Sequence, residues 1–189
     1  MTNVLLLHHA QGLTPGVLAF ADALRAAGHT VHAPDVYDGR TFENLDSGIA
    51  YAGEVGFETV MQRGVAAAEG QPERTVYIGV SLGVMAAQQL AQTRPGAAGA
   101  VFVASCLPAS EFGGWPDGVP VQVHGKDADP IFVDEGDLDA ARALVASVDT
   151  AELFLYPGDE HLFLDSSLPA YDAAATAVLT ARVLDFLAS

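Results

Sequence analysis

The sequence predicts an α/β fold in which a mostly parallel central sheet of about six or seven strands is covered by helices on both faces. Short apolar segments of strand length alternate with longer segments of helical periodicity, and Gly or Pro residues separate most of them. The chain has 189 residues, of which 50% are hydrophobic, which suits one core better than two. We therefore expect one domain over residues 1–189.

The first 70 residues of the chain contain two predicted strands and two predicted helices. Residues 4–7 form a continuous apolar run, as expected of a strand buried on both faces of a parallel sheet. Residues 15–27 have helical periodicity and end at a glycine, and residues 29–33 indicate a second strand. Residues 37–51 are rich in Gly and Asp without a period, which predicts a long loop, and residues 61–69 continue as a helix.

The rest of the chain repeats the alternation of strands and helices. Residues 74–79 predict a strand, and an Ala/Gln/Leu helix over 82–93 follows after a sharp turn. Such alternation predicts right-handed crossovers between parallel strands. The remaining elements are strands at 100–104, 119–124 and 151–156, and helices at 137–147 and from about 170 to 187.

The charge of the chain excludes two classes of partner. Its 24 Asp and Glu against 8 Lys and Arg give a formal net charge of −16, which repels phosphate backbones and anionic lipid heads. We therefore expect no nucleic acid and no membrane among its partners. No apolar run approaches the length of a membrane span, and the N-terminus lacks the basic segment of a signal peptide, so we expect a cytoplasmic protein. The sequence leaves the oligomeric state open, and a homodimer is one possibility.

Thiol and metal chemistry find little support. The single cysteine, Cys106, cannot form an internal disulfide, and its place after a strand favours an inert core thiol. His8 and His9 are adjacent, but adjacent strand residues point to opposite faces, so packing roles are favoured over a shared metal ion. We expect no metal and no cofactor.

The turn between the strand at 74–79 and the helix at 82–93 carries the strongest chemical signal. Residues 79–83 read G-V-S-L-G, a G-x-S-x-G motif that holds Ser81 at the tip of a strand-to-helix turn. The backbone N–H of Leu82 opens the helix, where the positive end of the helix dipole faces an oxyanion forming beside Ser81. Ser81 is therefore the candidate nucleophile.

A serine nucleophile needs a base, and the base needs a carboxylate that fixes its tautomer. Of six histidines, His161 follows the last predicted strand in a Gly/Pro loop and should emerge at the same sheet edge as Ser81. The loop after the strand at 119–124 offers two acids, of which Asp129 is preferred and Asp127 is the alternative. The order Ser81, Asp129, His161 is that of α/β hydrolases.

With these residues in place, most of the chain resembles the dienelactone hydrolase family, a compact branch of the α/β hydrolases. The resemblance lies in the turn at 79–83, in A-P-D-V-Y-D-G at 33–39, in D-P-I-F at 129–132 and in Y-P-G-D-E-H-L-F at 156–163. It implies that Ser81 is the nucleophile, Asp129 the acid and His161 the base. It also implies that the N–H of Ala10 complements that of Leu82 in the oxyanion hole.

Two departures from the family pattern concern the substrate. The enzymes that gave the family its name use a cysteine restrained by a glutamate from the first loop, whereas this chain has Ser81, and His9 stands in place of the glutamate. The family's arginine for a substrate carboxylate is replaced by apolar residues after His161. We therefore expect a small neutral ester, lactone or thioester as substrate.

Aromatic residues in loops after strands are candidates for the wall of the substrate pocket. They are Tyr37, Phe112 and Trp115, with His9 beside the first loop, although ordinary loop packing fits them equally well. The leading hypothesis is a serine hydrolase that works through a Ser-His-Asp triad and an acyl-enzyme. The alternatives are a non-catalytic small-molecule-binding protein on the same scaffold and an acyltransferase with the same triad.

Overall fold

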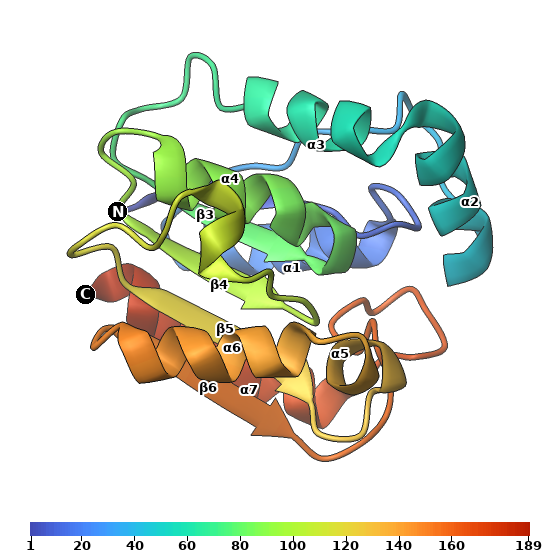
Figure 1. The fold of residues 1–189 in the computed structure, drawn as a ribbon. Coiled ribbons are helices and arrows are strands. Elements are labelled where there is room, and N and C mark those ends of the chain that lie inside the picture. The colour runs from blue at the N-terminus through green and yellow to red at the C-terminus, as the bar shows by residue number, and fades with distance from the viewer.

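Six parallel strands form the central sheet of the computed structural model, which describes residues 1–189 (Figure 1). Their order is β2-β1-β3-β4-β5-β6, and every neighbouring pair is parallel. This confirms the predicted fold class. The strands are β1 (Asn3–Leu7), β2 (Thr30–His32), β3 (Thr75–Val80), β4 (Gly99–Val103), β5 (Val121–Lys126) and β6 (Ala151–Tyr156).

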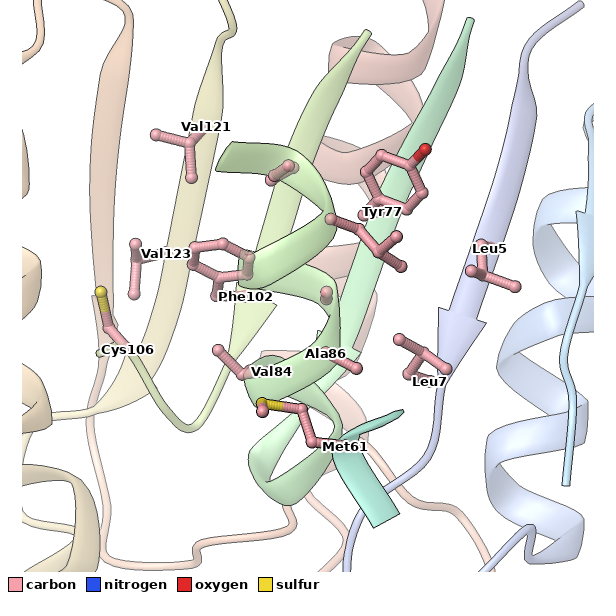
Figure 2. Close-up of a cluster of buried hydrophobic side chains, with 14 of the residues drawn as sticks. Leu5, Leu7, Met61, Tyr77, Val84, Ala86, Phe102, Cys106, Val121 and Val123 are labelled. Carbon is pink, nitrogen blue, oxygen red and sulfur yellow. The ribbon is translucent and has the colours of Figure 1, made fainter. Parts of the chain in front are cut away.

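Helices cover both faces of the sheet, and each face has its own apolar core. One core packs α1 and α7 against the sheet, and the other packs α2, α3, α4 and α6 against the opposite face. Figure 2 shows part of the second core, in which Val84 and Ala86 of α4 lie over Leu7, Tyr77 and Phe102 of the sheet. The helices are α1 (Pro15–Ala26), α2 (Leu45–Val55), α3 (Phe57–Ala66), α4 (Val84–Thr93), α5 (Pro130–Asp134), α6 (Asp137–Ser147) and α7 (Ala173–Ala188).

Burial of both faces explains the continuous apolar runs in the strands. Along β1, Leu5 and Leu7 belong to one core whereas Val4 and Leu6 belong to the other, because successive side chains point to opposite faces. The strand order reverses at the pair β1 and β3, so the loops that follow these two strands start side by side at the carboxyl edge of the sheet. In parallel sheets this is the usual place for a ligand site. None of the helices has the length and apolar character needed to cross a bilayer.

The expectation of a long loop over 37–51 is wrong, because α2 begins at Leu45, where the side-chain oxygen of Asn44 accepts the Ser47 N–H and caps the helix. Gly48 disfavours a helix by its intrinsic propensity, so the sequence pattern did not indicate α2. A Cβ at this position would collide with the carbonyl oxygen of Ala10, so the glycine lets α2 pack directly on the loop after β1. The next helix, α3, starts at Phe57, and α7 starts at Ala173, three residues later than predicted.

Candidate active site

Ser81 lies on the sharp turn between β3 and α4, at the first residue of a single 3₁₀ turn (Ser81–Gly83). Its φ of 48° is in the left-handed region, which non-glycine residues seldom adopt, so the surrounding packing must hold it there. Two glycines permit this packing. A Cβ on Gly79 would lie 2.6 Å from the Cα of Val84, and one on Gly83 would collide with the Leu7 carbonyl oxygen.

His161 and Asp129 meet Ser81 in one hydrogen-bonded chain. The Nε2 atom of His161 lies 2.8 Å from Ser81 Oγ, and its Nδ1 atom lies 2.6 Å from Asp129 Oδ2. The Asp129 carboxylate is fully buried and also accepts the Ile131 N–H at 3.0 Å, which caps α5. The imidazole retains 9% exposure. The imidazole of His161 therefore has a fixed carboxylate on one nitrogen and the serine hydroxyl on the other.

The structure places the alternative acid, Asp127, in a different role. Its side chain is exposed, and its Oδ1 atom accepts the Gly158 N–H at 3.1 Å. It ties the turn after β5 to the loop after β6, and its carboxylate has no contact with His161. The geometry therefore favours Asp129 as the acid.

Ala10 and Leu82 both line the cleft that opens over Ser81. Leu82 is the second residue of the helical turn, where backbone N–H groups lack partners within the helix. Ala10 is buried in the loop after β1, and its N–H donates to no protein acceptor. Two amide donors at the edges of one cleft, beside a serine, have the arrangement of an oxyanion hole.

The cleft has a volume of about 340 Å³ and two chemically different walls. The helices α2 to α4 contribute apolar side chains, and the segment from α5 to α6 contributes two carboxylates. No Lys or Arg lines it. Its lining includes Leu45, Ile49, Phe57, Met85, Leu107, Ile131, Ser105, Glu135, Asp137 and His161.

The four residues expected to wall the pocket lie elsewhere. Tyr37 is fully buried and packs edge-on against His8 and Tyr51, below the surface of the cleft. The Trp115 ring packs against Phe102, and its Nε1 atom donates to the Val119 carbonyl, while Phe112 packs on the same core. His9 is buried behind Ala10. Sequence position brings these residues near the sheet edge, but it does not fix the direction of their side chains.

A buried lysine that sequence reasoning missed holds the loop that carries His161. The ammonium of Lys126, at the end of β5, bonds to the Pro157 carbonyl at 2.7 Å and pairs with Asp172 and with Glu160 at 3.3 Å. Burial by itself would lower the pKa of Lys126, but the hydrogen bonds that it donates to the two carboxylates, together with their negative charges, raise it. The sequence feature that could have identified Lys126 is the presence of a lysine at the end of an otherwise buried strand.

Cys106 is not a second nucleophile in this arrangement. The thiol is buried, and burial together with the charge of Asp137 raises its pKa to about 12. At neutral pH it is therefore protonated and unreactive. Figure 2 shows Cys106 in the apolar core beside Val123.

The family model of the dienelactone hydrolase family matches residues 1–189. The chain belongs to this family. Membership confirms the resemblance drawn from the sequence and makes the chain a carboxylic ester hydrolase. A search of curated protein sequences finds no match.

Solved structures of other hydrolases share the fold. A dienelactone hydrolase-like promiscuous phosphotriesterase from metagenomic libraries has a TM-score of 0.75 at 21% identity, over 100% of this chain and 86% of its own. A putative dienelactone hydrolase from Klebsiella pneumoniae has a TM-score of 0.76 at 15% identity, over 100% of this chain and 87% of its own. A cold-adapted esterase from an Arctic intertidal metagenomic library has a TM-score of 0.65 at 18% identity, over 98% and 82%.

Proposed function

We propose that this family member is a serine hydrolase that cleaves a small, uncharged ester, lactone or thioester through an acyl-enzyme. The observation that carries the proposal is the continuous hydrogen-bonded chain from Asp129 through His161 to Ser81 at the edge of an apolar cleft. A serine hydroxyl becomes an effective nucleophile only when a base removes its proton, and this base is aligned for that transfer.

In the first half of the reaction, His161 Nε2 takes the proton of Ser81 Oγ while Oγ attacks the substrate carbonyl carbon. The N–H groups of Leu82 and Ala10 stabilise the oxyanion that forms. The carbonyl then re-forms, the bond to the leaving group breaks, and His161 returns the proton to the departing alcohol or thiol. In the second half, His161 deprotonates a water molecule whose oxygen attacks the acyl carbon. The bond from that carbon to Ser81 Oγ then breaks, His161 returns the proton to Oγ, and the acid leaves.

The lining of the cleft supports an uncharged substrate. Glu135 and Asp137 contribute negative charge, no cation offsets it, and Ile49 and Phe57 present apolar surface that is partly exposed to solvent. A substrate carboxylate would meet repulsion without a counter-ion. A short apolar acyl or alkoxy group would gain burial against the helices α2 and α3.

A fluorophosphonate probe and a panel of short p-nitrophenyl esters, thioesters and lactones test the function. We expect one probe molecule per chain, on the peptide that contains Ser81, and hydrolysis of some members of the panel. Folded protein that is not labelled would favour the binding-protein alternative. Labelled protein that passes the acyl group to an added alcohol in preference to water would favour the acyltransferase.

Substrate charge has its own test, with dimethyl and monomethyl succinate as the neutral and anionic members of a matched pair. Glu135→Lys should raise kcat/KM for the anionic monoester roughly two- to fivefold and leave the diester unchanged, since exposed charges interact weakly. Asp149→Lys is the control, because it makes the same change in net charge at an exposed position just before β6, at the opposite end of the strands. Equal effects of the two variants would contradict a role for the cleft charge.

A further inference from the structure

His8 and His9 are two buried titratable residues that the proposed reaction does not use. Both are fully enclosed, and both lie in the loop after β1 immediately before Ala10. They form no metal site, because their rings bond to different partners on different sides of the loop. Their hydrogen bonds instead converge on the backbone around Ala10.

The ring of His8 forms a hydrogen bond with the peptide group between His9 and Ala10, which carries the Ala10 N–H. Its Nδ1 atom lies 2.8 Å from the carbonyl oxygen of His9, and its Nε2 atom accepts the Val36 N–H at 3.1 Å. Burial lowers the pKa of His8 to about 4, so the ring is neutral and holds one proton. Because Nε2 is an acceptor, that proton lies on Nδ1 and is donated to the His9 carbonyl.

The hydrogen bond from His8 to the His9 carbonyl helps to fix the direction of the Ala10 N–H. The carbonyl of His9 also accepts the Gly12 N–H at 3.0 Å, so two donors hold it on one side of the loop. No peptide bond in the chain is cis, and in a planar trans peptide the C=O and N–H point in opposite directions. The Ala10 N–H is therefore turned away from these donors, unpaired, in a residue that lines the cleft with Ser81.

The ring of His9 holds the next peptide group, between Ala10 and Gln11, by accepting its N–H. Its Nδ1 atom accepts the Gln11 N–H at 3.2 Å, which places the ring proton on Nε2, 2.7 Å from Asp165 Oδ2. Asp165 lies four residues after His161 in the sequence and is buried. The oxyanion loop is thus tied to the segment that follows the catalytic base.

We propose that His8 and His9 are positioning residues that hold the Ala10 N–H of the oxyanion hole toward the substrate oxygen. The inference rests on the proposed serine hydrolase function. The two histidines do not touch the substrate. They contribute to transition-state stabilisation through the backbone that they hold in place. Preorganised donors of this kind act mainly on the transition state.

Half-isosteric variants test the proposal, because Asn can replace the Nδ1 position of a histidine and Gln the Nε2 position. His8→Asn keeps a donor for the His9 carbonyl and loses the hydrogen bond from the Val36 N–H. His8→Gln keeps an acceptor for the Val36 N–H and loses the hydrogen bond to the His9 carbonyl. Each variant removes one buried hydrogen bond. We expect kcat/KM for a neutral ester to fall about 10- to 100-fold in His8→Gln with KM nearly unchanged, and to stay close to wild type in His8→Asn.

The dissociation constant of a trifluoromethyl ketone is a second measurement, and it should not change if His8 only stabilises the fold. The dissociation constant of this oxyanion-forming inhibitor should rise in His8→Gln by the same factor as kcat/KM falls. His124→Gln is the control, because His124 is a buried, hydrogen-bonded histidine outside the cleft lining. It should lower the midpoint of urea unfolding and leave both kinetic readouts unchanged.

Equal activity of His8→Gln and His8→Asn would overturn the proposal. If His8→Gln does not fold, the pair His9→Asn and His9→Gln gives the same test, with activity retained only in His9→Asn, which keeps an acceptor for the Gln11 N–H. Failure of the proposed function is distinguishable. In that case the wild-type chain neither reacts with a fluorophosphonate nor hydrolyses esters, whereas failure of this inference leaves the wild type active.

Discussion

The pairs His161–Asp129 and His9–Asp165 have almost the same local geometry, with nitrogen–oxygen distances of 2.6 and 2.7 Å and buried carboxylates. They differ in what the second ring nitrogen meets. In His161 it faces the hydroxyl of Ser81, and in His9 it accepts a backbone N–H from Gln11. A histidine–carboxylate pair is thus suited to catalysis only when a nucleophile and a substrate cleft lie at its far end.

The carboxylates of the two pairs also differ in their surroundings. Asp129 accepts one further hydrogen bond, from the Ile131 N–H, whereas Asp165 also accepts bonds from Thr14 and from the side chain and backbone of Ser167. Asp165 joins the start of α1 to the segment before α7. Changes at Asp129 should therefore reduce activity, whereas changes at Asp165 should mainly reduce stability.

Removal of the nucleophile should give the largest effect and should be confined to the first pair. Ser81→Ala should lower kcat by about 10⁴- to 10⁶-fold, because no other group near His161 can form the acyl-enzyme. Its unfolding midpoint in urea should match that of the wild type, since Ser81 is only partly buried. Turnover within tenfold of wild type would contradict the assignment of Ser81.

Loss of the carboxylate that orients the base should rank second. Asp129→Asn should reduce kcat by on the order of 10⁴-fold, because an amide can donate to Nδ1 and hold the wrong tautomer. Asp127→Asn is the matched control two residues earlier, and it should retain activity, since the Asp127 side chain bonds only to the Gly158 N–H. Both are measured as kcat on the best ester of the panel, and the reverse ranking would make Asp127 the acid.

The contrast between the two pairs also explains which residues the sequence could identify. Ser81, Asp129 and His161 each follow the end of a parallel strand, and strand ends meet at one edge of the sheet whatever the loops do. His9 and Asp165 are separated by 156 residues, and nothing in either local sequence indicates the other. Pairs made by loop packing have no periodic or terminal signal of this kind.

The errors in the sequence reasoning have the same origin. Gly48 argues against a helix by local propensity, yet it lies inside α2 because the backbone of Ala10 leaves no room for a larger residue. Tyr37 and Trp115 lie in loops as expected, but packing turns their rings into the core. Propensity and loop position carry no information about such contacts.

Gly16→Ala should disrupt the second pair without changing any of its polar groups. A Cβ at Gly16 would collide with the Asp165 carboxylate and lie 2.6 Å from the backbone nitrogen of Ser166. The carboxylate is fixed by hydrogen bonds from His9, Thr14 and Ser167. We expect a loss of about 3 kcal/mol in the free energy of unfolding, from overpacking and broken bonds to a buried charge. Ala23→Gly, in an exposed turn of the same helix, is the control and should cost only about 1 kcal/mol.

The pH dependence of stability should separate Asp165 from other carboxylates. Burial alone would raise its pKa, but hydrogen bonds from His9, Ser167 and Thr14 together lower it to about 2, against about 3.9 in an unfolded chain. A lowered pKa in the folded state stabilises the fold fully above pH ~4, and this contribution is lost as the pH falls through about 2. The shift corresponds to roughly 2–3 kcal/mol at neutral pH.

Urea unfolding of the wild type and of Asp165→Asn at pH 7, 4 and 2.5 measures this contribution directly. The free-energy difference between the two proteins should be largest at pH 7 and should shrink toward pH 2.5. At that pH the Asp165 carboxyl group is protonated in the unfolded wild type while it is still mostly ionised in the folded protein, so unfolding takes up a proton, whereas the amide does not titrate. All other acids titrate equally in both proteins and cancel in the difference. A difference that stays constant with pH would mean that Asp165 contributes through shape and neutral hydrogen bonds alone, and its charge would then have no part in holding His9.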